Sequence, residues 1–371
     1  MVVPPLPDGW SRQDILALAL VRGLAGVDIR AMVEECPSLE AAIAHPPLHL
    51  EKRLRQEHLF DPLQPEELRR RAQEHSERLA ALNARAVTFW DDDYPALLRE
   101  IPYPPVVLYV QGTLQPADAL AIAIVGTRRC TTYGKLCAER FASEIARAGC
   151  IVVSGLATGI DSIAHTATLE AGGITYAVIG SGLDRLAPTS ARRLAEHIVR
   201  TGGAVLSEYP LGTVARPGYF PQRNRIISGI ARAVLVVESR RTGGSLITAQ
   251  FALDQSRELF AVPGSILAPT SEGTNLLIAQ QKAQAAVSPE LLLAELGVQP
   301  SAAPQQPTLQ FESPLEEQLW QQLSSEPQHV DDIAAAVGMS IGEVLGALLM
   351  MEFRGMVRQL PGKMFIRAVA E

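Results

Sequence analysis

The sequence AIAIVGTR at residues 121–128 decides the fold, because a short apolar run ends there in a glycine, a hydroxyl and a cation. Six other short apolar runs end in glycine or a small polar residue, and helical stretches separate most of them. They are residues 106–110, 151–153, 174–179, 204–206, 233–237 and 259–262. Near-continuous apolar strands of this kind are typical of a parallel sheet that helices cover on both faces. The pattern therefore predicts a doubly wound α/β domain over residues 91–297.

Smaller regions flank this domain. Residues 1–90 read as helical, and their glycine-rich turn between helices resembles a sterile-alpha-motif-like or helix-hairpin-helix domain. A plain helical bundle without a ligand fits the same pattern. Residues 298–313 are polar and proline-rich, which is typical of a linker. Residues 314–371 contain three helical segments and a hairpin centred on Pro361-Gly362, which is the outline of a winged helix.

Composition excludes several classes of protein. Hydrophobic residues make up 47% and charged residues 20% of the chain, so it is not wholly disordered. A net charge of −7 excludes a uniformly basic DNA-coating protein but not a locally basic groove. Aromatic residues make up only 5%, which excludes an extended stacking platform. The apolar run at 15–21 is too short to span a bilayer, and we expect no signal peptide before it. The four cysteines follow no disulfide pattern, which is typical of reduced thiols. We therefore expect a cytoplasmic protein without membrane contact.

The residues that follow the strands carry the chemistry, because ligands bind beyond the carboxyl ends of parallel strands. Gly126-Thr127-Arg128-Arg129 offers a close backbone approach and two arginines for a phosphate. SGLATGID at 154–161 leads into a helix and resembles an anion-binding nest. Gly134-Lys135 does not complete a P-loop, and the chain has no GxGxxG motif, so ATP hydrolysis and dinucleotide binding are weakly supported.

Asp161 and His165 stand one helical turn apart and could pair as a base and its orienting group. No nucleophile with a clear role accompanies them, which favours a structural reading. In that reading Asp161 caps the helix or braces the loop, and His165 is a buried, hydrogen-bonded partner.

An excess of arginine indicates a polyanionic ligand. Residues 185–225 contain seven arginines and two glutamates, although the alternative is a solvated helix face. Pro221 suits the first turn of a helix, and Arg223 and Arg225 then crowd a turn where the helix dipole disfavours cations. A bound anion would account for this arrangement, and we expect such strand-end arginines to carry little packing.

The segment ESRRTGGSLIT at 238–248 is a further cradle of glycine, serine and threonine beside two arginines. With the segments at 126–129, 154–161 and 220–229 it makes four on one sheet edge, which exceeds the needs of a mononucleotide. A strand of nucleic acid, which presents a phosphate at each step, would use them all.

Five blocks occur in one order along the chain: AIVGTR at 123–128, SGLATGIDSIAH at 154–165, FPQRNRIISG at 220–229, GSLITA at 244–249 and AVPG at 261–264. In these blocks the sequence resembles the DprA/Smf family, the bacterial DNA-processing proteins of natural transformation. The resemblance implies a Rossmann-like core between a helical N-terminal domain and a winged-helix tail. It also implies a non-catalytic protein, with no cofactor, that binds and protects single-stranded DNA and loads the RecA recombinase onto it. Family members dimerise through the core, and a single-strand-binding protein is a further expected partner.

The resemblance also implies which residues contact DNA, and none of them is expected to be catalytic or to bind a metal. They are Gly126, Thr127, Arg128, Ser154, Gly155, Phe220, Arg223, Asn224, Arg225, Gly243, Gly244 and Ser245.

Two rival readings remain open at this point. A nucleotide phosphoribohydrolase of the LOG-like group shares the architecture and uses the motif Gly-Gly-x-Gly-Thr-x-x-Glu. Here Leu246 and Gln250 replace the third glycine and the glutamate, so the carboxylate that stabilises the transition state is missing. In the second rival the winged helix is the main DNA reader. Residues 314–371 hold four basic and eight acidic residues, which favours a protein-contact or dimer-modulating role instead.

Overall fold

The computed structural model describes residues 3–51, 64–116, 119–186, 189–298, 311, 313–324 and 326–367. The chain divides into two compact units, Met1–Pro300 and Ser301–Glu371. The expected linker at 298–313 lies mostly outside the described residues, and the expected boundary at residue 90 stays a prediction.

One nine-stranded sheet organises the first unit, in the order β1-β2-β6-β5-β4-β3-β7-β8-β9. The strands are β1 Ala84–Thr88, β2 Val107–Gly112, β3 Ala121–Val125, β4 Ile151–Ser154, β5 Thr175–Ile179, β6 Ala204–Ser207, β7 Ala233–Val236, β8 Glu258–Ala261 and β9 Gln284–Ala285. The pairings from β6 to β9 are all parallel, whereas β2 runs antiparallel to β1 and β6. The order β5-β4-β3-β7-β8-β9 is that of a doubly wound nucleotide-binding sheet, so the predicted fold class is confirmed. Its switch point lies between β3 and β7.

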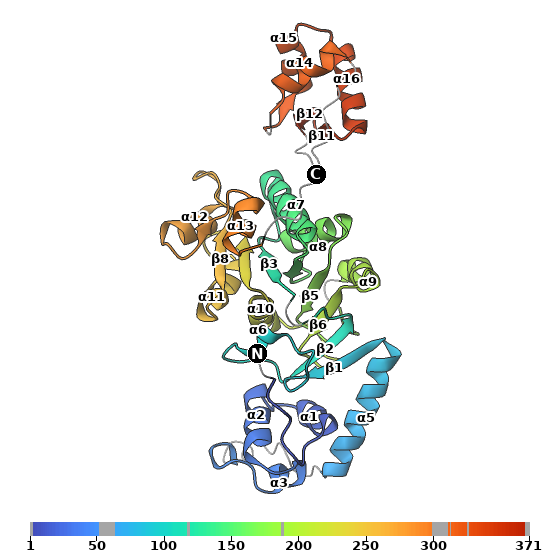
Figure 1. Ribbon diagram of the computed structural model, residues 1–371, viewed down its shortest axis with the longest axis vertical. Helices are drawn as coiled ribbons and strands as arrows, with labels where there is room; N and C mark the ends of the chain where they lie inside the picture. The colour runs from blue at the N-terminus through green and yellow to red at the C-terminus, as the bar shows by residue number, and fades with distance from the viewer. Residues whose placement is uncertain are drawn as a thin grey trace. The chain divides into compact units, whose positions relative to one another are not determined.

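Helices cover the two faces of this sheet, as strand alternation requires. Ile122 and Ile124 of β3 point into the core under α7 (Thr132–Arg147) and α8 (Ile160–Glu170). Ala123 and Val125 point to the other core, which α10 (Tyr219–Ile230) and α11 (Ser245–Asp254) share. Figure 1 shows α7, α8 and α9 following one another along one side of the sheet. The remaining helices of this part are α6 Ala96–Arg99, α9 Arg192–Arg200, α12 Glu272–Ala279 and α13 Pro289–Glu295.

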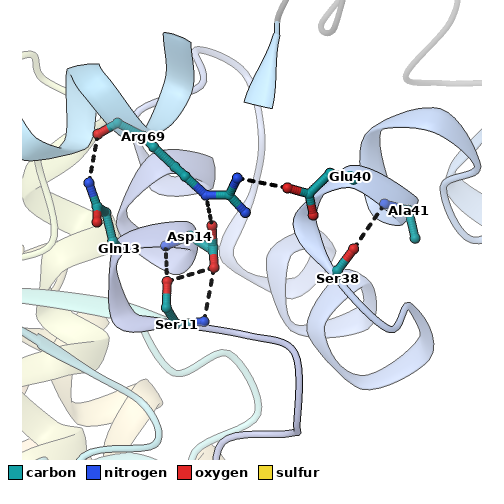
Figure 2. A network of polar contacts seen from close by, with 7 residues as sticks. All are labelled: Ser11, Gln13, Asp14, Ser38, Glu40, Ala41 and Arg69. Carbon is teal, nitrogen blue, oxygen red and sulfur yellow. Dashed lines mark hydrogen bonds and ion pairs between the residues drawn. The ribbon is translucent and has the colours of Figure 1, made fainter. Parts of the chain in front are cut away.

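The N-terminal region is helical, as predicted, and its described elements include α1 Arg12–Ala19, α2 Gly26–Glu35, α3 Leu39–Ala44 and α5 Pro65–Ala81. Figure 2 shows how Arg69 of α5 joins two other helices: its Nε donates to Asp14 Oδ1 at 2.7 Å and its Nη1 to Glu40 Oε1 at 2.7 Å. Buried residues of these helices and of β1 and β2 belong to one hydrophobic cluster. The helices therefore pack on the antiparallel end of the sheet, and their likeness to a sterile alpha motif stays a prediction.

The second unit is a winged helix, as the sequence predicts. Three helices surround a core that includes Leu319, Ile333, Leu348 and Phe365. A small antiparallel sheet in the order β10-β12-β11 closes it. The elements are α14 Pro314–Gln322, β10 Gln328–His329, α15 Val330–Val337, α16 Ile341–Phe353, β11 Val357–Leu360 and β12 Met364–Arg367.

In the described part of the chain, no single helix is long and apolar enough to cross a membrane. Val330–Val337 and Ile341–Glu352 reach that length and composition only as a pair, which is bent by 107° at its break.

Candidate nucleic-acid interface

The first turn of α10 lies across the carboxyl ends of the central strands. Its Phe220 ring lies 5.6 Å from the guanidinium carbon of Arg128, which follows β3. A Cβ atom on Gly180, which follows β5, would lie 3.3 Å from the carbonyl of Tyr219. The crossover from β6 to β7 begins at this edge, and Pro221 suits the first turn of a helix, so the sequence places the helix start here. We call this carboxyl end of the parallel strands, with the loops that follow them, the strand-end edge.

Arg223 is an internal residue of this edge. The residue is 4% exposed, and its guanidinium donates to the carbonyl of Gly155 at 2.6 Å and to the carbonyl of Val178. Burial lowers its pKa to about 10, although the nearby Asp161 raises it. The expectation that it carries little packing is wrong, because α10 inserts this side chain under the ends of β4 and β5.

Gly155 is a glycine because Arg223 occupies the space that a side chain would need. A Cβ atom there would lie 2.3 Å from the Arg223 Nη1 atom. Ser154, just before it, is fully buried and donates its hydroxyl to the carbonyl of Ile124 at 2.6 Å. Both predicted site residues therefore shape the loop from within.

Asp161 and His165 have structural environments, as the structural reading expects. Asp161 accepts from the Ala157 N–H at 3.4 Å, and burial raises the pKa of its carboxyl against the opposing effect of Arg223. His165 is fully buried with Nδ1 2.7 Å from Thr175 Oγ1, and burial, aided by Arg223, lowers its pKa to about 3. The imidazole is therefore neutral and serves the packing of α8 against β5.

Arg225 has protein partners too. Its Nη1 and Nη2 atoms donate to the two carboxylate oxygens of Glu208 at 2.9 and 2.6 Å, and its Nε donates to the Tyr103 carbonyl at 3.0 Å. Asn224 beside it is partly exposed. The crowding of Arg223 and Arg225 in one turn is thus accounted for by protein carbonyls and a carboxylate, without a bound anion.

Four exposed arginines lie on the loops after β3 and β7. Arg128 and Arg129 follow β3, and Arg240 and Arg241 follow β7; all four are exposed and none forms an ion pair with another described residue. The two strands are neighbours at the switch point, and the Thr127 N–H joins their loops by donating to the Glu238 carbonyl at 2.8 Å. Gly126 packs against Ile160, since a Cβ atom there would lie 2.6 Å from its side chain. The arginine-rich stretch at 185–225 also exposes Arg192, Arg193, Arg200 and Arg216 without an ion pair to a described residue, but its Arg223 and Arg225 are held by protein groups.

The predicted cradle at 243–245 begins α11. A Cβ atom on Gly243 would lie 2.2 Å from Ser239 Oγ, whereas one on Gly244 would meet nothing within 4 Å. Ser245 is buried and donates its hydroxyl to Ser239 Oγ at 2.9 Å. The loop is thus fixed from inside, and Gly244 leaves open space at the start of the helix.

Glu238 is a central residue that sequence reasoning missed. Its buried carboxylate accepts from the Thr131 N–H at 2.9 Å, the Thr131 hydroxyl at 2.6 Å and the Thr270 hydroxyl at 3.2 Å. A Cβ atom on Gly134 would lie 2.2 Å from one of its oxygens. One acid therefore joins the loops after β3, β7 and β8. Its only signal in the sequence is a carboxylate placed directly after an apolar strand.

The arrangement can bind phosphates. Guanidinium groups at the rim pair with phosphate oxygens, and a loop frame that is already hydrogen-bonded needs little rearrangement. Among the described residues, no group of three or more histidine, cysteine, aspartate or glutamate side chains could hold a metal ion. Gln250, which stands where the phosphoribohydrolase motif has its glutamate, lies on the exposed side of α11, and its amide donates to Asp254 Oδ1 at 2.8 Å.

Comparison with known proteins gives a consistent result. The family model of DNA recombination-mediator protein A matches residues 85–297, and the model of the DprA winged helix domain matches residues 299–363. The protein Smf of Synechocystis is 34% identical, over 95% of this chain and 98% of that protein. The X-ray structure of DNA processing protein A from Streptococcus pneumoniae has a TM-score of 0.59 at 34% identity, and covers 76% of this chain and 95% of its own. The DNA processing protein A of Helicobacter pylori, whose structure is described for its single-stranded DNA binding mode, has a TM-score of 0.53 at 29% identity, over 58% of this chain and 96% of its own.

Proposed function

We propose that this chain, which belongs to the DNA recombination-mediator protein A family, binds single-stranded DNA along the strand-end edge of its α/β unit. The observation that carries the proposal is a set of four exposed arginines at the switch point that form no ion pair with a described residue: Arg128, Arg129, Arg240 and Arg241. The single-stranded DNA binding named for the Helicobacter pylori relative supports it. Contacts of this kind go to phosphates, so we expect little sequence preference.

We further propose that the bound strand is protected and passed to the RecA recombinase in the cytoplasm during transformation. In this role the protein is non-catalytic, needs no cofactor and acts as a dimer formed through the core. A single-strand-binding protein is the partner that it has to displace. These steps rest on the family likeness. They are tested by RecA filament assembly on DNA coated with single-strand-binding protein, where the protein should shorten the lag, and by light scattering for the dimer.

The binding site itself is tested by removing one cation from each loop. The Arg128→Gln/Arg240→Gln double variant should lose about 1.4 from the slope of log affinity against log salt for single-stranded DNA, since each phosphate contact contributes about 0.7. The control is Arg232→Gln/Lys282→Gln, which removes the same charge from exposed positions before β7 and β9, at the opposite edge. Equal affinity and slope for the two double variants would move the site elsewhere.

A further inference from the structure

Two tyrosine rings stack at the strand-end edge, next to its arginines. Tyr209 follows β6 and Tyr219 opens α10, and their ring centroids lie 4.3 Å apart with planes inclined by 23°. Both side chains are partly exposed. The residue after Tyr219 is Phe220, whose ring lies 5.6 Å from the Arg128 guanidinium carbon. Tyr219 is therefore the sequence neighbour of Phe220, whose ring lies beside one of the four arginines that we propose bind phosphates.

The stack is held in position by the protein. The Tyr209 hydroxyl donates to Gln222 Oε1 at 3.2 Å, which ties the loop after β6 to the first turns of α10. The close approach of Gly180 to the Tyr219 carbonyl fixes the other ring's backbone over the end of β5. The exposed Arg216 places its guanidinium carbon 5.9 Å from the Tyr219 ring centroid. An aromatic pair with a cation beside it is thus present before any ligand arrives.

The four arginines alone do not account for a preference for single strands. Phosphates line duplex DNA as densely as single-stranded DNA, so a cationic rim attracts both. The faces of bases inside a duplex are covered by their neighbours. An aromatic side chain can stack only on a base that is free of such neighbours, which is the usual state in a single strand.

We infer that the Tyr209–Tyr219 stack is a nucleobase-binding subsite, and that it selects single strands over duplex DNA. The inference rests on the proposed function, because a strand must lie on the rim for its bases to reach the rings. Every base has a π face, so the subsite tolerates any sequence. Arg216 adds a cation that can face either a base or the adjoining phosphate.

The test compares an oligothymidylate with an abasic oligonucleotide of the same length, which keeps the phosphates and lacks the bases. Tyr219→Leu should weaken binding of the oligothymidylate about fivefold or more, because that is what loss of one stacked base costs. Its affinity for the abasic strand, and the salt slope for both, should stay at wild-type values. Tyr219→Phe keeps the ring and should restore oligothymidylate binding.

The matched control is Phe251→Leu, which removes a partly exposed ring from α11 that makes no ring contact with other described residues. It should change neither affinity. Tyr209→Leu provides the same comparison if Tyr219→Leu fails to fold, as judged by thermal unfolding.

The outcomes separate this inference from the proposed function. An equal loss on both strands, or no loss on either, would overturn the subsite. If the Arg128→Gln/Arg240→Gln variant weakens both strands while the tyrosine variants weaken neither, only the subsite falls. If the arginine variant weakens neither strand, the proposed function falls as well.

Discussion

Helices α10 and α16 each occupy the position where their type of fold commonly contacts a nucleic acid, but their surroundings differ in charge. The first turn of α10 lies beside exposed arginines that have no acidic partner among the described residues. Helix α16, in the place of a recognition helix, carries Glu343 and Glu352 and no basic residue, and exposes Ile341, Leu349 and Met350. A recognition helix without basic residues adds nothing to the counterion release that supplies most of the affinity for DNA, and in residues 314–371 four basic residues stand against eight acidic ones. The comparison teaches that unpaired charge, more than fold type, indicates which unit meets DNA.

The largest expected effect is a loss of stability that distinguishes the buried Arg223 from the exposed Arg128. Arg223→Ala should lower the free energy of unfolding by about 3 kcal/mol or more, because it leaves the buried Asp161 without its cation and two carbonyls without a donor. Arg128→Ala should change stability by no more than about 0.5 kcal/mol while weakening DNA binding. Urea unfolding measures both, and equal stability of the two variants would contradict this division.

A second difference between the units is the burial of their histidines. His165 is neutral and fully buried in the first unit, whereas the histidine of the second unit, His329, is partly exposed. The folded-state pKa of His165 is about 3 and its unfolded value is about 6.5, so between these pH values only the unfolded state binds the proton. Stability is therefore lost as pH falls, by about 2 kcal/mol from pH 7 to pH 5.

The His165→Gln variant should show a flatter dependence of thermal unfolding on pH over the same interval. His75, whose pKa burial lowers to about 4, acts in the same direction, so the difference between wild type and variant isolates His165. Parallel pH profiles would show that His165 does not titrate in this way.

Two glycines that look alike in sequence should behave differently. Gly155→Ala would place a Cβ atom 2.3 Å from Arg223 Nη1, and we expect it to cost about 1–3 kcal/mol of stability. Gly244→Ala meets open space at the start of α11 and should cost no more than about 0.5 kcal/mol. Melting temperatures compare the stability of the two variants. A lower melting temperature for Gly244→Ala than for Gly155→Ala would contradict the close packing of Arg223 against Gly155.

The smallest effect should follow removal of the winged helix. A chain that ends at Pro307 should keep its affinity for single-stranded DNA within about fivefold, or roughly 1 kcal/mol, because the removed part is acidic. Fluorescence anisotropy on the full-length and shortened proteins measures this. Outright loss of binding would reverse the roles assigned to α10 and α16.

Sequence patterns were sufficient for the fold because its strands are short, apolar and ended by glycine or small polar residues. Residues 121–125 and 151–153 fall within β3 and β4, and the hairpin around Pro361-Gly362 joins β11 to β12. The pattern missed β1, Ala84–Thr88, where a half-exposed antiparallel strand carries few apolar residues. Its pairing with β2 depends on contacts distant in sequence, which periodicity does not report.

The site was predicted less completely, because the exposure of a side chain and its pairing depend on contacts between residues that are distant in sequence. Nothing near Arg223 in sequence indicates that carbonyls of Gly155 and Val178 receive its guanidinium. The same holds for Tyr209 and Tyr219, whose stacking could not be read from an aromatic content of 5%. The predicted contact residues remain predictions, and the exposure of Arg129, Arg240 and Arg241, which the motifs after the strands already offered for a phosphate, makes these three further groups to mutate.

The carboxylate of Glu238 has a consequence for the speed of association. Because it already joins Thr131 and Thr270, the loops that carry the arginines do not have to close around an arriving strand. A binding event that needs no loop closure is limited by diffusion and by the electric field of the four arginines. The association rate constant for single-stranded DNA should therefore be high in dilute buffer and fall steeply with added salt.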